Sequence, residues 1–147
     1  MTETRSIVVE EVYPHPPETV WRALTDPALM GRWMMAPAGF APVVGQEFTF
    51  ATKPAGTWDG TIACRVVEIA PAARMVWTWK GGDAANQGYG AVLDSTVTFT
   101  LSPDGTGTRL RLEHAGFTMP EHAFAFEAMG KGWGQILSRL AEVVAAG

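Results

Sequence analysis

The strongest constraint on the fold is a strict alternation of apolar and polar residues in LDSTVTFTL, residues 93–101. Its odd-numbered positions are apolar apart from Ser95, and its even-numbered positions are Asp or Thr. TRLRLEH at 108–114 repeats the pattern, with leucines and His114 on one face and arginines and Glu113 on the other. A period of two predicts strands with one buried and one solvated face, as in an antiparallel sheet. The intervening SPDGTG predicts a hairpin turn.

This hairpin brings a serine and a histidine to the same face. For both apolar faces to be buried, paired residue numbers must sum to an odd value, because a slip of one residue turns a strand over. A sum of 209 sets Ser95 opposite His114, within cross-strand reach. Such a pair suggests an acid-base or nucleophile-base dyad, or a hydroxyl that simply satisfies a buried imidazole. No carboxylate is evidently placed to orient the ring, so the pattern favours the second interpretation.

Four further runs are rich in β-branched and aromatic residues and are bounded by Gly, Pro or Asp, which is typical of strands. They are SIVVEEVY, EFTFA, GTIACRVVEI and RMVWTWK. The last of these brings Met75, Trp77 and Trp79 onto a common face. The inward face of residues 62–69 stays open, because one candidate face carries Arg65 and the other carries Glu68.

Two short helices are predicted directly after the first strand. Pro17 suits the first position of one helix, and Asp26 suits the cap of a second helix that starts at Pro27. Each spans only about two turns, fewer than an isolated helix needs in water. Both helices must therefore be stabilised by packing on the sheet.

A long helix is predicted at the end of the chain. An apolar stripe recurs there every three or four residues: His122, Phe126, Met129, Trp133, Ile136, Leu140 and Val143. Gly130, Gly132 and Gly134 interrupt it, each at a cost of roughly 1 kcal/mol relative to alanine. Either another element approaches the helix backbone closely beside Gly130, Gly134 and Ala141, or the helix breaks and 121–129 forms a separate short helix.

Composition narrows the functional classes. The 147 residues suit one domain, 1–147, and a net charge of −4 offers no basic field for nucleic acid. The start MTETRSIVVEEVY lacks the continuous apolar region of a signal peptide, and no stretch is long enough to span a membrane, so we expect a cytoplasmic protein. Cys64 is expected to be a buried, unreactive thiol. The three histidines lack the spacing of metal ligands, so no metal or other cofactor is expected.

Several segments carry a resemblance to a known family: PPETVWRALTDP followed by RW, GQEFTF, VVEIAPAARMVWTW, STVTFTL with GTRLRLEHAGF, and GWGQILSRLAEVV. Together they cover nearly the whole chain in order. The sequence resembles the activator-of-heat-shock-protein-90-ATPase homologue family of the SRPBCC, or START-like and birch-pollen-allergen-like, superfamily. The resemblance implies an α+β helix-grip fold, in which a curved antiparallel sheet wraps around the long C-terminal helix. The two short helices would then fill the open side of the sheet.

The resemblance also implies a cavity between sheet and long helix. Six Trp, seven Phe and seven Met supply large apolar surfaces to line it. Trp21 is expected to anchor the short helices to the sheet, and Trp33, Met34 and Met35 are expected near the entrance. The ligand-binding residues predicted from this are Trp33, Met35, Phe50, Trp58, Trp77, Trp79, Phe99, His114, Phe117, Met129 and Trp133. GGDAANQGYG is expected to form a loop over the mouth, with Tyr89 as a contact.

Three functions follow as hypotheses. The first is a binding protein that encloses a small apolar or amphipathic molecule. The second is an enzyme of the cyclase or dehydratase type found elsewhere in the superfamily, working in the same cavity. The third is a domain that interacts with a heat-shock-protein-90-type chaperone, as the family name implies. Phe124 lies off the helical stripe and suggests a homodimer contact or an ordinary exposed residue.

Overall fold

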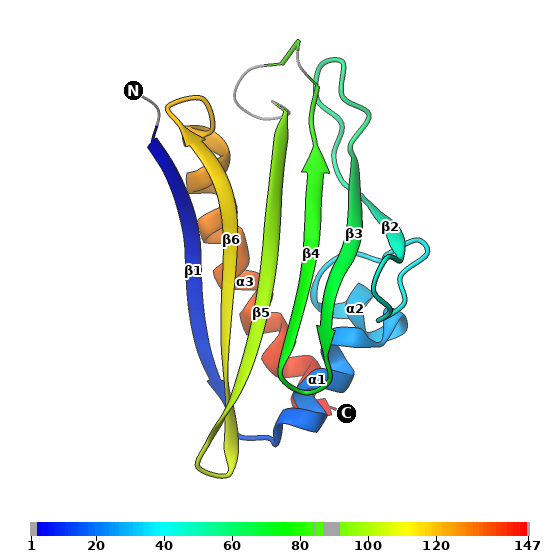
Figure 1. Ribbon diagram of the computed structural model, residues 1–147, viewed down its shortest axis with the longest axis vertical. Helices are drawn as coiled ribbons and strands as arrows, with labels where there is room; N and C mark the ends of the chain where they lie inside the picture. Colours follow the sequence, from blue (N-terminus) through cyan, green and yellow to red (C-terminus); the bar gives the residue numbers. More distant parts are fainter. Residues whose placement is uncertain (1–2, 84, 87–91, 147) are drawn as a thin grey trace.

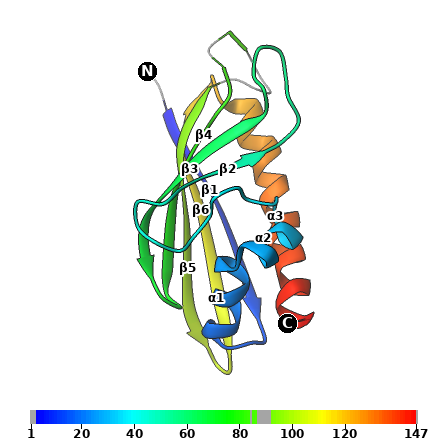
Figure 2. The same cartoon turned by 90° about the vertical axis from the view of Figure 1, so that its right-hand side faces the viewer.

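The computed structural model describes residues 3–83, 85–86 and 92–146. Its elements are β1 (Glu3–Tyr13), α1 (Pro17–Thr25), α2 (Pro27–Trp33), β2 (Glu47–Ala51), β3 (Thr61–Ala70), β4 (Arg74–Gly81), β5 (Leu93–Asp104), β6 (Gly107–Met119) and α3 (Ala123–Ala146). The strands form one antiparallel sheet in the order β1-β6-β5-β4-β3-β2. Long curved strands lie on one side, and all three helices lie on the other (Figure 1, Figure 2). The predicted helix-grip arrangement is therefore confirmed.

The β5–β6 hairpin keeps the predicted faces but not the predicted register. Val97 pairs with His114, so paired numbers sum to 211, and the sum of 209 is wrong by two. The reason is the turn: Asp104 pairs with Gly107, which places the two-residue turn at Gly105 and Thr106, with φ +59° at Gly105. A shift of two residues preserves the parity, so His114 still faces the core.

A β-bulge explains why strand β3 shows no consistent inward face in the sequence. Ile62, Cys64 and Val66 are buried, and the register against β4 then shifts between Val66 and Glu68. One extra residue in the strand reverses which side chains point inward. Each charged residue of this strand therefore stays on the outer face, although Arg65 and Glu68 differ in parity.

Trp33 anchors the two short helices to the sheet. Trp33, at the end of α2, is fully buried, and its Nε1 donates to the Ala23 carbonyl at 2.9 Å. Its ring meets Phe99 of the sheet edge-on, with centroids 6.2 Å apart. Trp21 is only partly buried. Trp33 of the second helix therefore ties the two helices to the sheet, and Trp21 of the first helix packs against the same core with part of its surface exposed.

The cap of α2 is as the sequence predicts. Pro27 occupies the first turn, and the Asp26 side chain accepts a hydrogen bond from the Ala28 amide at 2.9 Å. We expect Asp26→Ala to lower the free energy of unfolding by about 1 kcal/mol, because one helix amide loses its partner. Urea denaturation measures this loss. Asp26→Ser, which keeps a cap acceptor, should restore most of it, and equal losses in both variants would contradict the capping role.

Helix α3 runs without a break from Ala123 to Ala146. The alternative of a separate short helix before Gly130 is therefore wrong. The expected close approach is also wrong, because a Cβ added at Gly130, Gly132 or Gly134 would meet no atom within 4 Å. The helix is instead tied to the sheet elsewhere: the buried Tyr13 hydroxyl donates to the Leu137 carbonyl at 3.0 Å. Burial raises the pKa of this phenol, which keeps it a hydrogen-bond donor.

Candidate functional site

A cavity of about 280 Å³ lies between the sheet and the N-terminal half of α3. This volume far exceeds the roughly 10–15 Å³ that one water molecule needs. The described residues that line it come from the segment after α2, the β2–β3 connection, strands β3 to β5 with the start of their connection, and α3. They are Met34, Met35, Thr52, Trp58, Ile62, Trp79, Gly81, Gly82, Leu93, Phe124, Ala125, Ala128, Met129, Gly132, Trp133 and Ile136.

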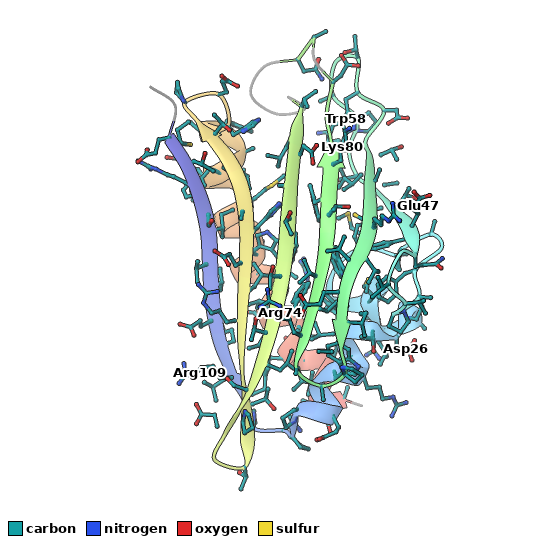
Figure 3. The ribbon with its side chains drawn as sticks, viewed as in Figure 1. Asp26, Glu47, Trp58, Arg74, Lys80 and Arg109 are labelled. Atoms are coloured by element: carbon teal, nitrogen blue, oxygen red, sulfur yellow. The ribbon has the colours of Figure 1, made fainter. Side chains whose placement is uncertain are left out.

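The local structure explains why this end of the molecule is hollow. Alongside four larger side chains, helix α3 contributes the small residues Ala125, Ala128 and Gly132 to the wall, so part of the helix side of the cavity stays unfilled. On the sheet side, Gly81 lets Trp58 lie close to strand β4, since a Cβ there would be 3.3 Å from the Trp58 ring. Figure 3 shows Trp58 near the upper end of β4. Its indole donates to the Thr61 carbonyl at 3.0 Å, which fixes the ring.

The structure places the predicted ligand-binding residues in two groups. Five lie in the cavity wall: Met35, Trp58, Trp79, Met129 and Trp133. The other six are fully or almost fully buried outside the wall: Trp33, Phe50, Trp77, Phe99, His114 and Phe117. Ring contacts explain the second group, because Trp77 lies 5.0 Å from Phe99 and 5.9 Å from Phe50 between centroids. These rings fill space against one another.

Several wall residues were not among the predicted set. Ile136 lies on the predicted helical stripe, and Leu93 and Ile62 lie on strand faces, so periodicity marks them as buried without marking them as wall. Phe124 lines the cavity although it is 55% exposed, which its position off the helical stripe did not suggest. The sequence carries no local signal for Gly132 beyond its presence inside a helix.

A buried chain of hydrogen bonds lies directly behind the wall. His114, with no exposed surface, accepts a hydrogen bond at Nδ1 from Trp133 Nε1 at 3.0 Å. Its Nε2 lies 2.7 Å from Ser95 Oγ, and the Ser95 hydroxyl donates to the Trp79 carbonyl at 3.1 Å. Ser95 and His114 thus meet diagonally across the hairpin rather than as directly paired residues. This chain of hydrogen bonds, called the relay below, begins and ends at tryptophans of the cavity wall.

The donor and acceptor properties of these groups determine which atoms of the relay carry the protons. An indole N–H can only donate, so His114 Nδ1 carries no proton and the neutral ring carries its proton on Nε2. The Nε2–H then donates to Ser95, whose own proton is directed at the Trp79 carbonyl. Burial lowers the pKa of His114 to about 3, which keeps the ring neutral. In this arrangement the imidazole has no free lone pair to take a proton from Ser95.

Comparison with known families shows to which family the chain belongs. The family model described as "Activator of Hsp90 ATPase homolog 1-like protein" matches residues 14–145. The chain belongs to this family. No curated protein matched the chain.

Solved structures agree with this family and fold. The protein MLL2253 from Mesorhizobium loti is 37% identical, with a TM-score of 0.82 over 97% of this chain and 98% of that one. CalU16 from Micromonospora echinospora is 26% identical, with a TM-score of 0.73 over 98% of this chain and 86% of that one. The Bacillus halodurans protein BH1534 shares the fold at 24% identity, with a TM-score of 0.75 over 98% and 99% of the two chains.

Other predicted features of this family member have mixed outcomes. Cys64 is buried as expected, and burial raises the pKa of its thiol to about 12. Within the ranges that the structure describes, no three His, Cys, Asp or Glu side chains gather to hold a metal ion. No helix among the described residues has the length and apolarity needed to cross a membrane. Tyr89 and most of its loop lie outside the described residues.

Proposed function

We propose that this family member binds a small apolar or amphipathic molecule in the cavity between the sheet and α3. The observation that carries the proposal is the chemistry of the wall. None of the described residues that line the cavity is an Asp, Glu, His, Lys, Arg, Cys or Tyr. An apolar ligand would leave no charge buried without a partner there, whereas a charged group would lose its hydration uncompensated.

The size of the hydrophobic effect makes such binding measurable. A ligand that buries about 300 Å² of apolar surface gains roughly 7–8 kcal/mol from removal of that surface from water. Lost translational and side-chain freedom offsets part of this gain. Trp58, Trp79 and Trp133 supply aromatic surface, and Met35 and Met129 supply side chains that adapt to the shape of a ligand. We therefore expect selectivity for apolar surface rather than for a particular polar group.

Catalysis in the same cavity has weaker support. A general acid or base must contact the substrate, whereas the relay of Ser95 and His114 lies behind the wall. Each polar proton of the relay already forms a hydrogen bond within the protein. The family description also names an activator of a chaperone ATPase. The chaperone hypothesis predicts that the purified domain binds a heat-shock-protein-90-type chaperone with its cavity either open or blocked.

Filling the cavity from Gly132 tests the binding function. We expect Gly132→Leu to weaken binding of the uncharged fluorescent probe N-phenyl-1-naphthylamine at least tenfold, because the new side chain takes up cavity volume. The same change should raise stability by about 1 kcal/mol, since leucine favours a helix over glycine. Fluorescence titration measures the first effect and urea denaturation the second.

Gly130→Leu is the matched control. Gly130 lies in the same helix, has equally open space at its Cβ position and does not line the cavity. It should gain similar stability and keep the wild-type Kd. If Gly132→Leu binds the probe as tightly as Gly130→Leu does, the cavity is not the binding site.

A further inference from the structure

We infer that His114 is a positioning residue for the cavity: its neutral imidazole holds the Trp133 indole in the orientation that forms the wall. This inference rests on the proposed binding function. It concerns a residue that does not itself line the cavity. Its basis is the direct hydrogen bond of 3.0 Å from Trp133 Nε1 to His114 Nδ1, formed where neither residue has more than 2% of its surface exposed.

The relay holds the imidazole itself in place. The ring of His114 packs 4.8 Å from Phe117, 5.3 Å from Trp79 and 5.8 Å from Trp133 between centroids. Its far nitrogen is held by the Ser95 hydroxyl on the neighbouring strand. A ring fixed on both nitrogens has one orientation and one tautomer, so it presents its acceptor to α3 in a single place.

The relay also determines what the cavity offers to a ligand. The indole N–H of Trp133 is committed to His114 and points away from any occupant, so the ligand meets the carbon face of that ring. Loss of the acceptor would leave a buried N–H without a partner, and the indole would then turn toward water or toward the ligand. His114 therefore acts on affinity through Trp133, without contact with the ligand.

The test separates the hydrogen bond from the bulk of the side chain. His114→Leu removes the acceptor, and His114→Asn restores an acceptor at the position of Nδ1. Two readouts are needed: the indole proton–nitrogen NMR signal of Trp133, assigned with Trp133→Phe, and the Kd for N-phenyl-1-naphthylamine. His15→Leu is the control, because His15 lies in the connection between β1 and α1 and does not line the cavity, so its replacement should change neither readout.

We expect His114→Leu to shift the Trp133 indole signal, speed its hydrogen exchange and weaken probe binding about tenfold, and His114→Asn to recover both readouts. Unchanged affinity in a folded His114→Leu protein would overturn the inference. So would an Asn variant that restores the indole signal and not the affinity. If His114→Leu does not fold, Ser95→Ala replaces it: this change frees Nε2, and the inference requires that both readouts change.

If the proposed binding function is wrong, the two readouts differ from those expected when only the inference about His114 is wrong. If the wild-type protein binds no probe, the binding proposal is overturned for this ligand class. The NMR signal still tests the structural half of the inference, namely that His114 holds the Trp133 indole. It reports the hydrogen bonding of that indole without any ligand. An indole signal that is identical in wild-type protein and His114→Leu would overturn that half.

Discussion

Acidification from pH 6.5 to pH 3 is expected to destabilise the chain through His114 by about 1.4 kcal/mol per pH unit. The folded state lowers the pKa of this histidine from 6.5 to about 3 by burial. Below pH 6.5 the unfolded chain therefore takes up a proton that the folded chain does not. The contribution of His114 is complete above pH 6.5, falls as the pH drops, and levels off below about 3.

The measurement is the free energy of unfolding from urea titrations at several pH values, in wild-type protein and in His114→Asn. Asparagine does not titrate, so the difference between the two slopes isolates the histidine and cancels the carboxylates. The wild-type curve should be the steeper one throughout this range. Parallel curves would show that His114 takes up its proton at the same pH in the folded and the unfolded chain, which would contradict the lowered pKa.

Trp33→Ala is expected to lower the free energy of unfolding by about 3–5 kcal/mol, the usual cost of removing a large buried aromatic side chain. Trp33 is fully buried, contacts Phe99 and satisfies the Ala23 carbonyl within α1. Its loss would remove a side chain that contacts both the first helix and the sheet. Chemical denaturation of the variant measures the effect.

Trp21→Ala is the control for this change. Trp21 is the same residue type in the preceding helix and is only partly buried, so its removal should cost clearly less. Equal losses in the two variants would mean that α1 and α2 share the anchoring role. A larger loss in Trp21→Ala would contradict the assignment of Trp33 as the anchor.

Alternation in the sequence predicts faces well and registers poorly. The odd and even positions of β5 and β6 identify the core side correctly, because parity does not change when a pairing slips by two residues. The register itself depends on which two residues make the turn, and both Asp104-Gly105 and Gly105-Thr106 are compatible with the sequence. In β3 alternation does not predict the faces either, because one extra residue at the bulge reverses the parity within a single strand.

The cavity was harder to predict than the fold because periodicity reports burial and not what a buried side chain faces. Phe50, Trp77 and Trp79 all lie on the inner face of the sheet, yet Trp79 alone of the three lines the cavity. Trp79 shares the cavity wall with small residues of α3 such as Gly132, whereas Trp77 packs against the rings of Phe50 and Phe99. The sequence shows Gly132 as a cost to the helix, and only the assembled structure shows that it borders a cavity.

The most direct test of the central claim is native mass spectrometry of the chain isolated from its natural source, followed by solvent extraction of whatever is bound. The binding account predicts a noncovalent adduct at one copy per chain, apolar or amphipathic in character, that is lost in Gly132→Leu and retained in Gly130→Leu. A bare chain mass for the isolated protein, with no binding of N-phenyl-1-naphthylamine in titration, would contradict it.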